Sequence, residues 1–125
     1  MILDTNALSA LATRDLTAIN RLQSAKTIAV TIISLGEYHF GISQSRYRQE
    51  LKTWLASFLE RAQVLFVDLD TLTHYAAIRR ELKNSGTPIP ANDCWIAALV
   101  RQYRMPIMSK DRHFDQVSDL LRVDW

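Results

Sequence analysis

The sequence is poor in cysteine and glycine, and it has no long hydrophobic run. Cys94 is the only cysteine among 125 residues, so an internal disulfide and a zinc site made of several thiolates are both excluded. The three glycines (Gly36, Gly41 and Gly86) cannot form a glycine-rich phosphate-binding loop. No apolar run approaches the roughly 20 residues of a membrane span, so we expect no membrane partner. The first residues lack a signal-peptide pattern, which favours a cytoplasmic protein.

The composition is that of an ordinary globular domain. Hydrophobic residues make up 48% of the chain and charged residues 22%, close to globular averages. A chain of this length buries about two-thirds of its unfolded surface on folding, so we expect a single domain over residues 1–125. The net charge of +2 permits a nucleic-acid partner but does not require one.

Short runs rich in β-branched residues alternate with longer stretches of helical periodicity. This alternation predicts an α/β fold, with a parallel sheet covered by helices on both faces. We expect strands over residues 1–3, 27–32, 64–67, 107–108 and 121–123, and helices over residues 5–13, 16–24, 34–42, 46–62, 71–84 and 92–103.

Four acidic residues follow expected strands or begin expected helices at one edge of this sheet. The carboxyl ends of parallel strands open on a single edge, where ligands of such sheets bind. We therefore expect the four side chains to share a pocket. They are Asp4, Glu37, Asp93 and Asp111, called here the acidic quartet, and Asn6 and Ser109 add neutral oxygens nearby.

Clustered carboxylates favour a hard divalent cation. Without one they repel one another and raise one another's pKa values. Mg²⁺ prefers oxygen ligands and keeps several waters. It can also activate a water and stabilise the charge of a phosphodiester under attack. The quartet therefore points to metal-dependent hydrolysis of a phosphate ester.

Each member of the quartet also has a purely structural interpretation. Asp4 and Asp111 can cap the turns that follow them. Glu37 is the fourth residue of SLGE at 34–37, which fits a capping box with Ser34. Asp93 stands at a helix start, where the helix dipole favours a negative charge.

Four motifs resemble those of the PIN-domain family. They are LDTN at residues 3–6, SLGE at 34–37, NDCWIAA at 92–98 and SKDRHF at 109–114. The chain length and the closing LRVDW are similar to the VapC-type toxins of bacterial toxin–antitoxin pairs. The resemblance implies a three-layer α/β/α fold around a mostly parallel sheet of four to five strands. It further implies an Mg²⁺- or Mn²⁺-dependent endoribonuclease, commonly a homodimer, that a cognate antitoxin inhibits.

The resemblance also implies a role for each motif residue. Asp4, Asp93 and Asp111 would hold the metal, and Glu37 would complete the site or position the attacking water. Asn6 matches the polar position after the first acid. Ser109 stands where the family more often has threonine, so a hydroxyl is kept.

Basic and imidazole side chains near the quartet are further candidates. Lys110 and Arg112 flank Asp111 and are expected to contact RNA phosphates. Among the three histidines, only His113 is expected to lie near a substrate, and a surface or packing role is the simpler interpretation for it as well.

Two other functions remain open from the sequence. An aspartyl phosphotransferase or phosphatase would use Asp4 as nucleophile, but its usual second acid is replaced by Asn6, which cannot transfer a proton. A non-catalytic binding module would use the acids only as caps and would gain no stability from Mg²⁺. A nuclease acting on DNA is excluded by nothing in the residues.

Overall fold

The computed structural model describes all residues from Met1 to Trp125 and contains a five-stranded, all-parallel sheet in the order β3-β2-β1-β4-β5. The predicted α/β class with a mostly parallel sheet is confirmed, and no strand is antiparallel. The elements are β1 (Ile2–Leu3), α1 (Thr5–Ala12), α2 (Leu16–Leu22), β2 (Ala29–Thr31), α3 (Ile32–Ser43), α4 (Arg48–Leu59), β3 (Gln63–Leu65), α5 (Leu69–Ser85), α6 (Ala91–Tyr103), β4 (Ile107–Met108), the 3-10 helix η1 (Arg112–Gln116) and β5 (Arg122–Val123).

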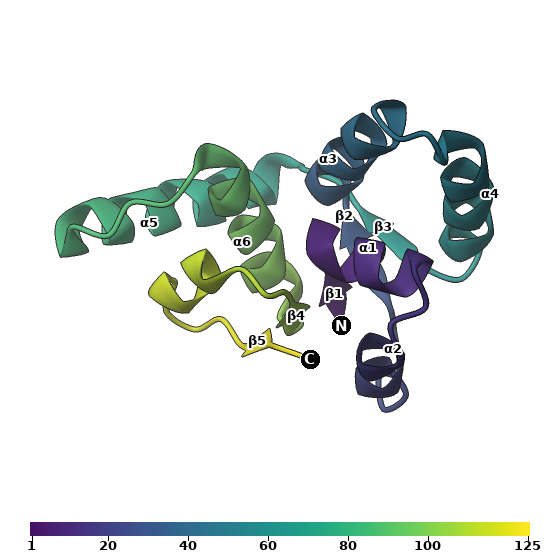
Figure 1. The fold of residues 1–125 in the computed structure, drawn as a ribbon. Coiled ribbons are helices and arrows are strands. Elements are labelled where there is room, and N and C mark those ends of the chain that lie inside the picture. Colours follow the sequence, from purple (N-terminus) through teal and green to yellow (C-terminus); the bar gives the residue numbers. More distant parts are fainter.

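Helices cover both faces of the sheet, which gives the three expected layers. In Figure 1, α5 and α6 lie on one side of the strands, and α1, α3 and α4 lie on the other. Successive strand residues point to opposite faces, so Ile2 packs in the core beneath α5 and α6, while Leu3 packs beneath α1 and α3. In the same way, Ile107 packs in the core beneath α5 and α6, and Met108 packs in the core beneath α1 and α3.

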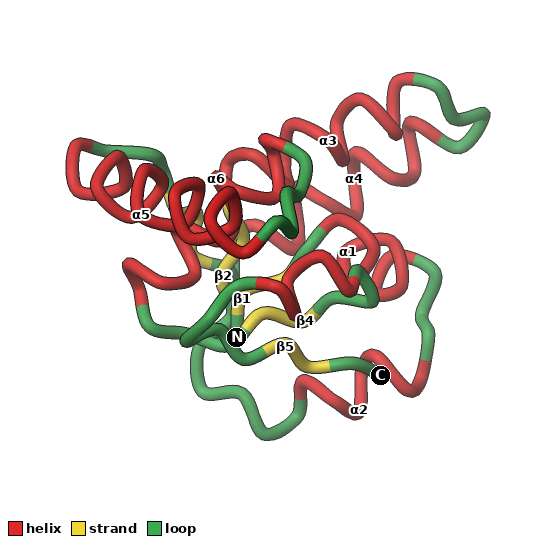
Figure 2. The backbone as a smooth tube through the Cα atoms, turned by 90° about the vertical axis from the view of Figure 1, so that its left-hand side faces the viewer, coloured by secondary structure: helices red, strands yellow, loops and turns green.

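The second layer of helices includes a pair that extends away from the sheet. Figure 2 shows α3 and α4 side by side, joined by a loop at their outer end. Trp54 and Phe58 of α4 stack with ring centroids 5.2 Å apart, and Trp54 meets the edge of Tyr38 of α3. Aromatic contacts of this kind hold the pair together, and the pair packs in the same core as the strand residues Leu3 and Val30.

Most elements begin or end one to three residues from the expected positions; for example, the helix expected over residues 46–62 is α4 (Arg48–Leu59), and the strand expected over residues 64–67 is β3 (Gln63–Leu65). The strand predicted over residues 27–32 is shorter, because α3 begins at Ile32 and its N-cap is Thr31, whose side chain accepts a hydrogen bond from the Ser34 amide. The helix expected from residue 92 begins at Ala91, with Pro90 as N-cap. The helix α5 is capped at Gly86, which has the left-handed φ of 70° that glycine adopts without steric cost.

The strand order places a topological switch at the centre of the sheet. From β1 the chain builds outward through β2 and β3 on one side, and later through β4 and β5 on the other. Ligands of open α/β sheets bind at such a point, beyond the carboxyl ends of the strands. Asp4 and Ser109 are the first residues after β1 and β4, so both stand at this position.

Candidate functional site

Asp4 is a buried carboxylate at the switch point. Only 5% of its surface is exposed. The hydroxyl of Ser109 donates a 2.7 Å hydrogen bond to Oδ2 of Asp4, and Ser34 donates a longer one of 3.5 Å to Oδ1. Although Asp4 is the N-cap residue of α1, its side chain makes no capping hydrogen bond. The structural interpretation of Asp4 as a cap is therefore wrong.

Glu37 lies on the second turn of α3 and faces the same site. Its Oε2 accepts a hydrogen bond of 3.2 Å from the hydroxyl of Thr5, the residue after Asp4. The capping box proposed for Glu37 does not form, because the helix starts three residues before the position that this motif requires. Glu37 is thus free of any capping role.

Asp93, Asp111 and His113 come together from α6 and η1. Nδ1 of His113 lies 2.8 Å from Oδ2 of Asp93 and 3.1 Å from Oδ1 of Asp111. One ligand atom from each of the three lies within 4.8 Å of the other two, a spacing that suits a shared metal ion. Asp111 also accepts a hydrogen bond of 2.9 Å from the amide of His113. Its predicted role as a turn cap is confirmed, and this role leaves Asp111 in the site.

Burial and mutual repulsion oppose ionisation of these carboxylates. Burial raises the pKa of Asp4, and the negative charge of Asp111 raises it further. The hydrogen bond from Ser109 acts in the opposite direction and lowers this pKa. Burial likewise raises the pKa of Glu37, helped by the charges of Asp4 and Asp93. Burial also raises the pKa of Asp93, helped by Asp111 and Asp4.

The donor set fits a hard divalent cation. A cation among the acids would offset the burial and the repulsion that raise these pKa values, and the carboxylate oxygens are the ligands that Mg²⁺ and Mn²⁺ prefer. In the structure the acids are partly compensated by His113, whose pKa is raised by its hydrogen bond to Asp93 and by the charge of Asp111. The sequence positions of the quartet, 4, 37, 93 and 111, are thus joined in one electrostatic site.

Comparison with known proteins identifies the family. Residues 1–120 match the PIN domain family. The chain belongs to the PIN domain family. This PIN domain is 29% identical to Ribonuclease VapC2 of Haemophilus influenzae over 127 residues, which span 99% of this chain and 96% of that protein. It is 26% identical over 105 residues to Ribonuclease VapC2 of Rickettsia felis, spanning 83% of this chain and 78% of that protein.

Solved structures confirm the PIN fold. The structure of VapBC2 from Rickettsia felis, bound to a DNA fragment from its promoter, superposes with a TM-score of 0.89 at 24% identity. The match covers 99% of this chain and 97% of that chain. DNA-bound VapBC from Salmonella typhimurium has a TM-score of 0.87 at 24% identity, and the match covers 99% of this chain and 96% of that chain.

No helix of this PIN domain has both the length and the apolar character that a membrane crossing needs.

The other expected site residues differ in where they point. Oδ1 of Asn6 accepts a hydrogen bond of 3.1 Å from the backbone amide of Lys110, so Asn6 ties α1 to the loop after β4. The ammonium group of Lys110 pairs with Asp124 at 3.0 Å and lies 4.4 Å from the ring centroid of Trp125. It is therefore directed at the C-terminus and not at the quartet. Arg112 is exposed and makes no salt bridge.

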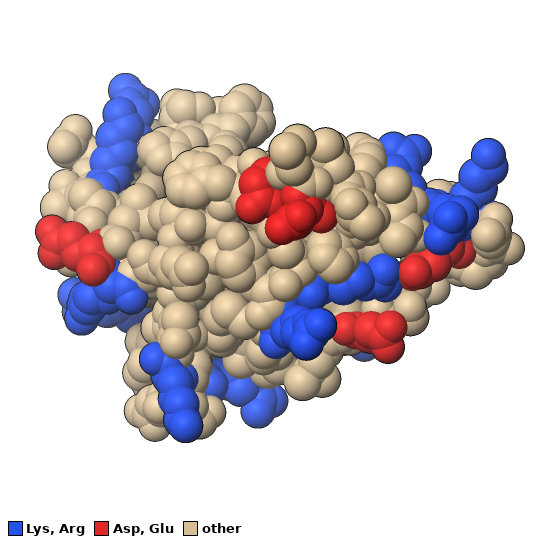
Figure 3. Space-filling model, turned by 180° about the vertical axis from the view of Figure 1, so that it is seen from behind, with Lys and Arg blue, Asp and Glu red and all other residues tan.

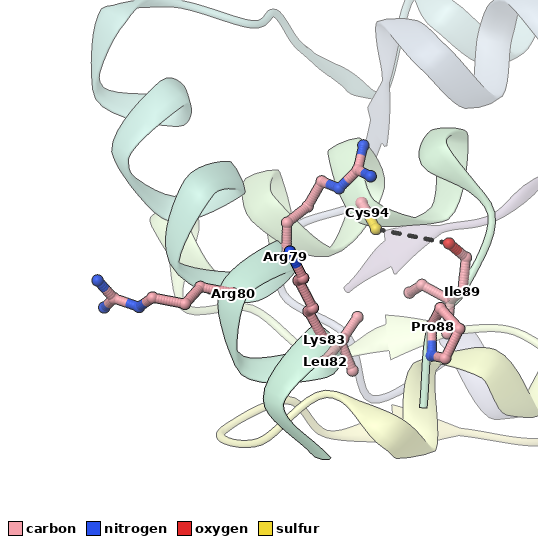
Figure 4. Close-up of a pocket in the computed structure, with 7 residues that line it drawn as sticks. All are labelled: Arg79, Arg80, Leu82, Lys83, Pro88, Ile89 and Cys94. Carbon is pink, nitrogen blue, oxygen red and sulfur yellow. Dashed lines mark hydrogen bonds between the residues drawn. The ribbon is translucent and has the colours of Figure 1, made fainter. Parts of the chain in front are cut away.

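A separate hollow, with no quartet residue in its lining, is formed beside α5. It has a volume of about 530 Å³ and lies between α5 and the segment that leads into α6, as Figure 4 shows. Cys94, the neighbour of Asp93, forms part of its wall and is buried. Arg79 and Lys83 line the hollow, and neither makes a salt bridge.

Sequence reasoning gave His113 and Thr5 too little weight. Both are adjacent or nearly adjacent to quartet residues, and that proximity was the available signal. The contact of His113 with Asp93, 20 residues away, depends on how η1 packs against α6. The hydrogen bond from Thr5 to Glu37 spans 32 residues. Neither pairing has a local sequence pattern.

Proposed function

We propose that this PIN domain is a divalent-metal-dependent endoribonuclease that acts in the cytoplasm as the toxin of a toxin–antitoxin pair. One observation carries the proposal: the acidic quartet meets at the switch point of the sheet, and burial and mutual repulsion raise the pKa values of three of its members. The VapC ribonuclease names of similar proteins support RNA as the substrate. The whole chain, residues 1–125, acts as a single domain.

Each residue of the site has a role that follows from its position. Asp4, Asp93 and Asp111 would hold the Mg²⁺ or Mn²⁺ ion through their carboxylate oxygens. Such a cation, when bound, acidifies a water and neutralises charge on the scissile phosphate. Glu37 orients the attacking water and accepts its proton, because its carboxylate faces the site beside Asp4 and is held there by the hydrogen bond from Thr5. Ser109 fixes the Asp4 carboxylate through the 2.7 Å hydrogen bond.

Unpaired cations near the site supply contacts for the RNA backbone. Arg112 stands between Asp111 and His113 and is free to reach a phosphate. On α5, Lys83 and Arg79 line the hollow that includes Cys94 (Figure 4), where Arg79 also donates a hydrogen bond of 2.9 Å to the Tyr75 hydroxyl. Figure 3 shows Lys and Arg side chains projecting around the margins of one face of the molecule. Arginine and lysine on phosphates give affinity without reading sequence.

A second groove provides a place for the antitoxin. It lies between α1, α3 and α4, has a volume of about 320 Å³, and is lined by Tyr38, Ile42 and Leu51 among others. Glu37 and Thr5 also line the groove, so it includes one member of the acidic quartet. An antitoxin segment with apolar side chains and a terminal Lys or Arg would fill the groove and neutralise the quartet.

A homodimer is supported by an apolar patch after β3. Phe66, Leu69 and Leu72 are 60%, 83% and 47% exposed, and Leu69 and Leu72 lie one turn apart on α5, as expected for apolar side chains at an interaction surface. On α3, the helix of Glu37, only Phe40 adds a large exposed apolar side chain beyond Ile32, because Tyr38 and Ile42 are buried in the core.

The phosphotransferase alternative is less well supported by the geometry. It needs an acid/base group at position 6, and the Asn6 side chain is engaged with the backbone of Lys110. The binding-module alternative required capping roles, which neither Asp4 nor Glu37 has.

Cleavage of RNA by the purified protein tests the proposal. We expect Mn²⁺- or Mg²⁺-dependent cleavage that Asp4→Asn and Asp93→Asn each reduce by at least about 100-fold, in the range that follows loss of a group stabilising transition-state charge. Asp70→Asn is the matched control, because Asp70 is exposed on the first turn of α5. Cleavage that is unaffected by EDTA, or equal losses in Asp70→Asn and Asp93→Asn, would refute the assignment.

A further inference from the structure

His113 places an imidazole nitrogen between two carboxylates of the quartet. Its side chain is 50% exposed, so packing alone does not hold it there. Its polar side-chain contacts are the two acids, at 2.8 Å from Asp93 and 3.1 Å from Asp111. No other basic side chain makes an ion pair with the quartet.

We propose that Nδ1 of His113 is a direct ligand of the metal held by Asp93 and Asp111, and that this nitrogen makes the site select Mn²⁺ over Mg²⁺. The inference rests on the proposed function, because it assumes that the quartet binds a divalent cation. It adds a ligand from outside the quartet and a metal preference.

The spacing of the three donor atoms suits one coordination sphere. Adjacent ligands of an octahedral ion, each about 2.1 Å from the metal, are about 3.0 Å apart. The observed distances from Nδ1 to the Asp93 and Asp111 oxygens, 2.8 and 3.1 Å, match this edge length. The positions of Asp111 and His113 are coupled by the hydrogen bond from the His113 amide to Asp111. A cation entering here meets His113 without a large rearrangement of η1.

The chemistry of the donor decides the metal. Carboxylates and water suit Mg²⁺ and Mn²⁺ alike, whereas imidazole favours the transition metals. Nδ1 faces the acids, so the neutral ring can give its lone pair to the ion and leave the Nε2 proton to solvent. A merely electrostatic role predicts the opposite behaviour, because a cation would then have to displace His113, and removal of the ring would strengthen binding.

Metal titration of the intact protein distinguishes these roles. Calorimetric titration with Mn²⁺ and with Mg²⁺ is compared between the wild type, His113→Gln and the matched control His74→Gln, whose ring lies on α5 and contacts no acid. We expect His113→Gln to weaken Mn²⁺ binding by about 10- to 100-fold, a range seen even when outer-shell partners of a metal are lost. Mg²⁺ binding should weaken much less, and His74→Gln should match the wild type.

Pulsed electron paramagnetic resonance of the Mn²⁺-loaded protein provides a direct readout. A coupling from a directly bonded ¹⁴N nucleus is expected in the wild type and should be absent in His113→Gln. Unchanged or tighter Mn²⁺ binding by His113→Gln, or a wild-type spectrum without that coupling, would overturn the inference. If Asp93→Asn abolishes binding while His113→Gln does not weaken it, only this inference fails; if the wild type binds neither ion, the proposed function fails with it.

Discussion

Ser109 links two members of the quartet, and its hydroxyl offers a measurable test of how the site is held. The residue is fully buried. Its Oγ donates a 2.7 Å hydrogen bond to the Asp4 carboxylate and accepts one of 2.9 Å from the Asp111 amide. Ser109→Ala removes both interactions and leaves the backbone bonds of β4 in place.

The cost follows from these two hydrogen bonds. A bond to a charged group contributes about 1.5–3 kcal/mol, and an unpaired buried N–H costs about 1–3 kcal/mol. Small movements of neighbouring atoms recover part of the energy of these two hydrogen bonds. We therefore expect Ser109→Ala to lower the free energy of unfolding by about 2–4 kcal/mol. For a chain of this size that corresponds to a fall in Tm of roughly 8–16 °C.

The loss should also depend on pH. The Ser109 hydroxyl opposes the burial that raises the pKa of Asp4, so the variant should have an Asp4 pKa that is higher still. When folding raises the pKa of an acid, the free energy of unfolding falls as the pH rises from the unfolded-state pKa to the folded-state pKa. The difference between Ser109→Ala and the wild type should therefore be larger at neutral pH than at about pH 4.5.

Urea denaturation with EDTA present, followed by circular dichroism at both pH values, measures the effect. Ser43→Ala is the control, because the Ser43 hydroxyl is exposed and bonds only to the Phe40 carbonyl. Its change should stay within about 0.5 kcal/mol. If Ser109→Ala cost no more than Ser43→Ala, or cost the same at both pH values, the proposed coupling of Ser109 to Asp4 would be wrong.

Three further predictions follow from the same geometry. Gly86→Ala should lower the free energy of unfolding in urea by about 1 kcal/mol, because Gly86 has a φ of 70°, and a neutral result would contradict this. Mn²⁺ at about 100 times its Kd should add about 2.7 kcal/mol to the wild type by calorimetry, but not to Asp93→Asn. As the pH rises from about 4.5 to 8, the metal-free wild type should lose stability relative to Asp93→Asn. Burial raises the pKa of Asp4, Glu37 and Asp93, and Asp93 raises the pKa of His113, so the wild type loses favourable protonation over this range. A stability difference that does not vary with pH would refute this prediction.

Local sequence signals determined the elements and the members of the quartet. The β-branched runs and helical periodicities located all five strands, with boundary errors where capping decided the outcome, as at Thr31 and Ser34. Asp4 and Asp111 could be placed at an edge of the sheet because they directly follow apolar strands. The parallel order of α/β chains then indicated that these strand ends meet.

Tertiary packing alone decided the contacts within the site. The switch point between β1 and β4 brings Ser109 to Asp4 across 105 residues, and the packing of η1 on α6 brings His113 to Asp93. The same packing directed Lys110 to the C-terminus. Sequence spacing fixes which residues share an element, but the angles and distances between elements depend on how the two hydrophobic cores fill. For this reason the carboxylates could be named from the sequence, whereas their burial, raised pKa values and imidazole partner required the fold.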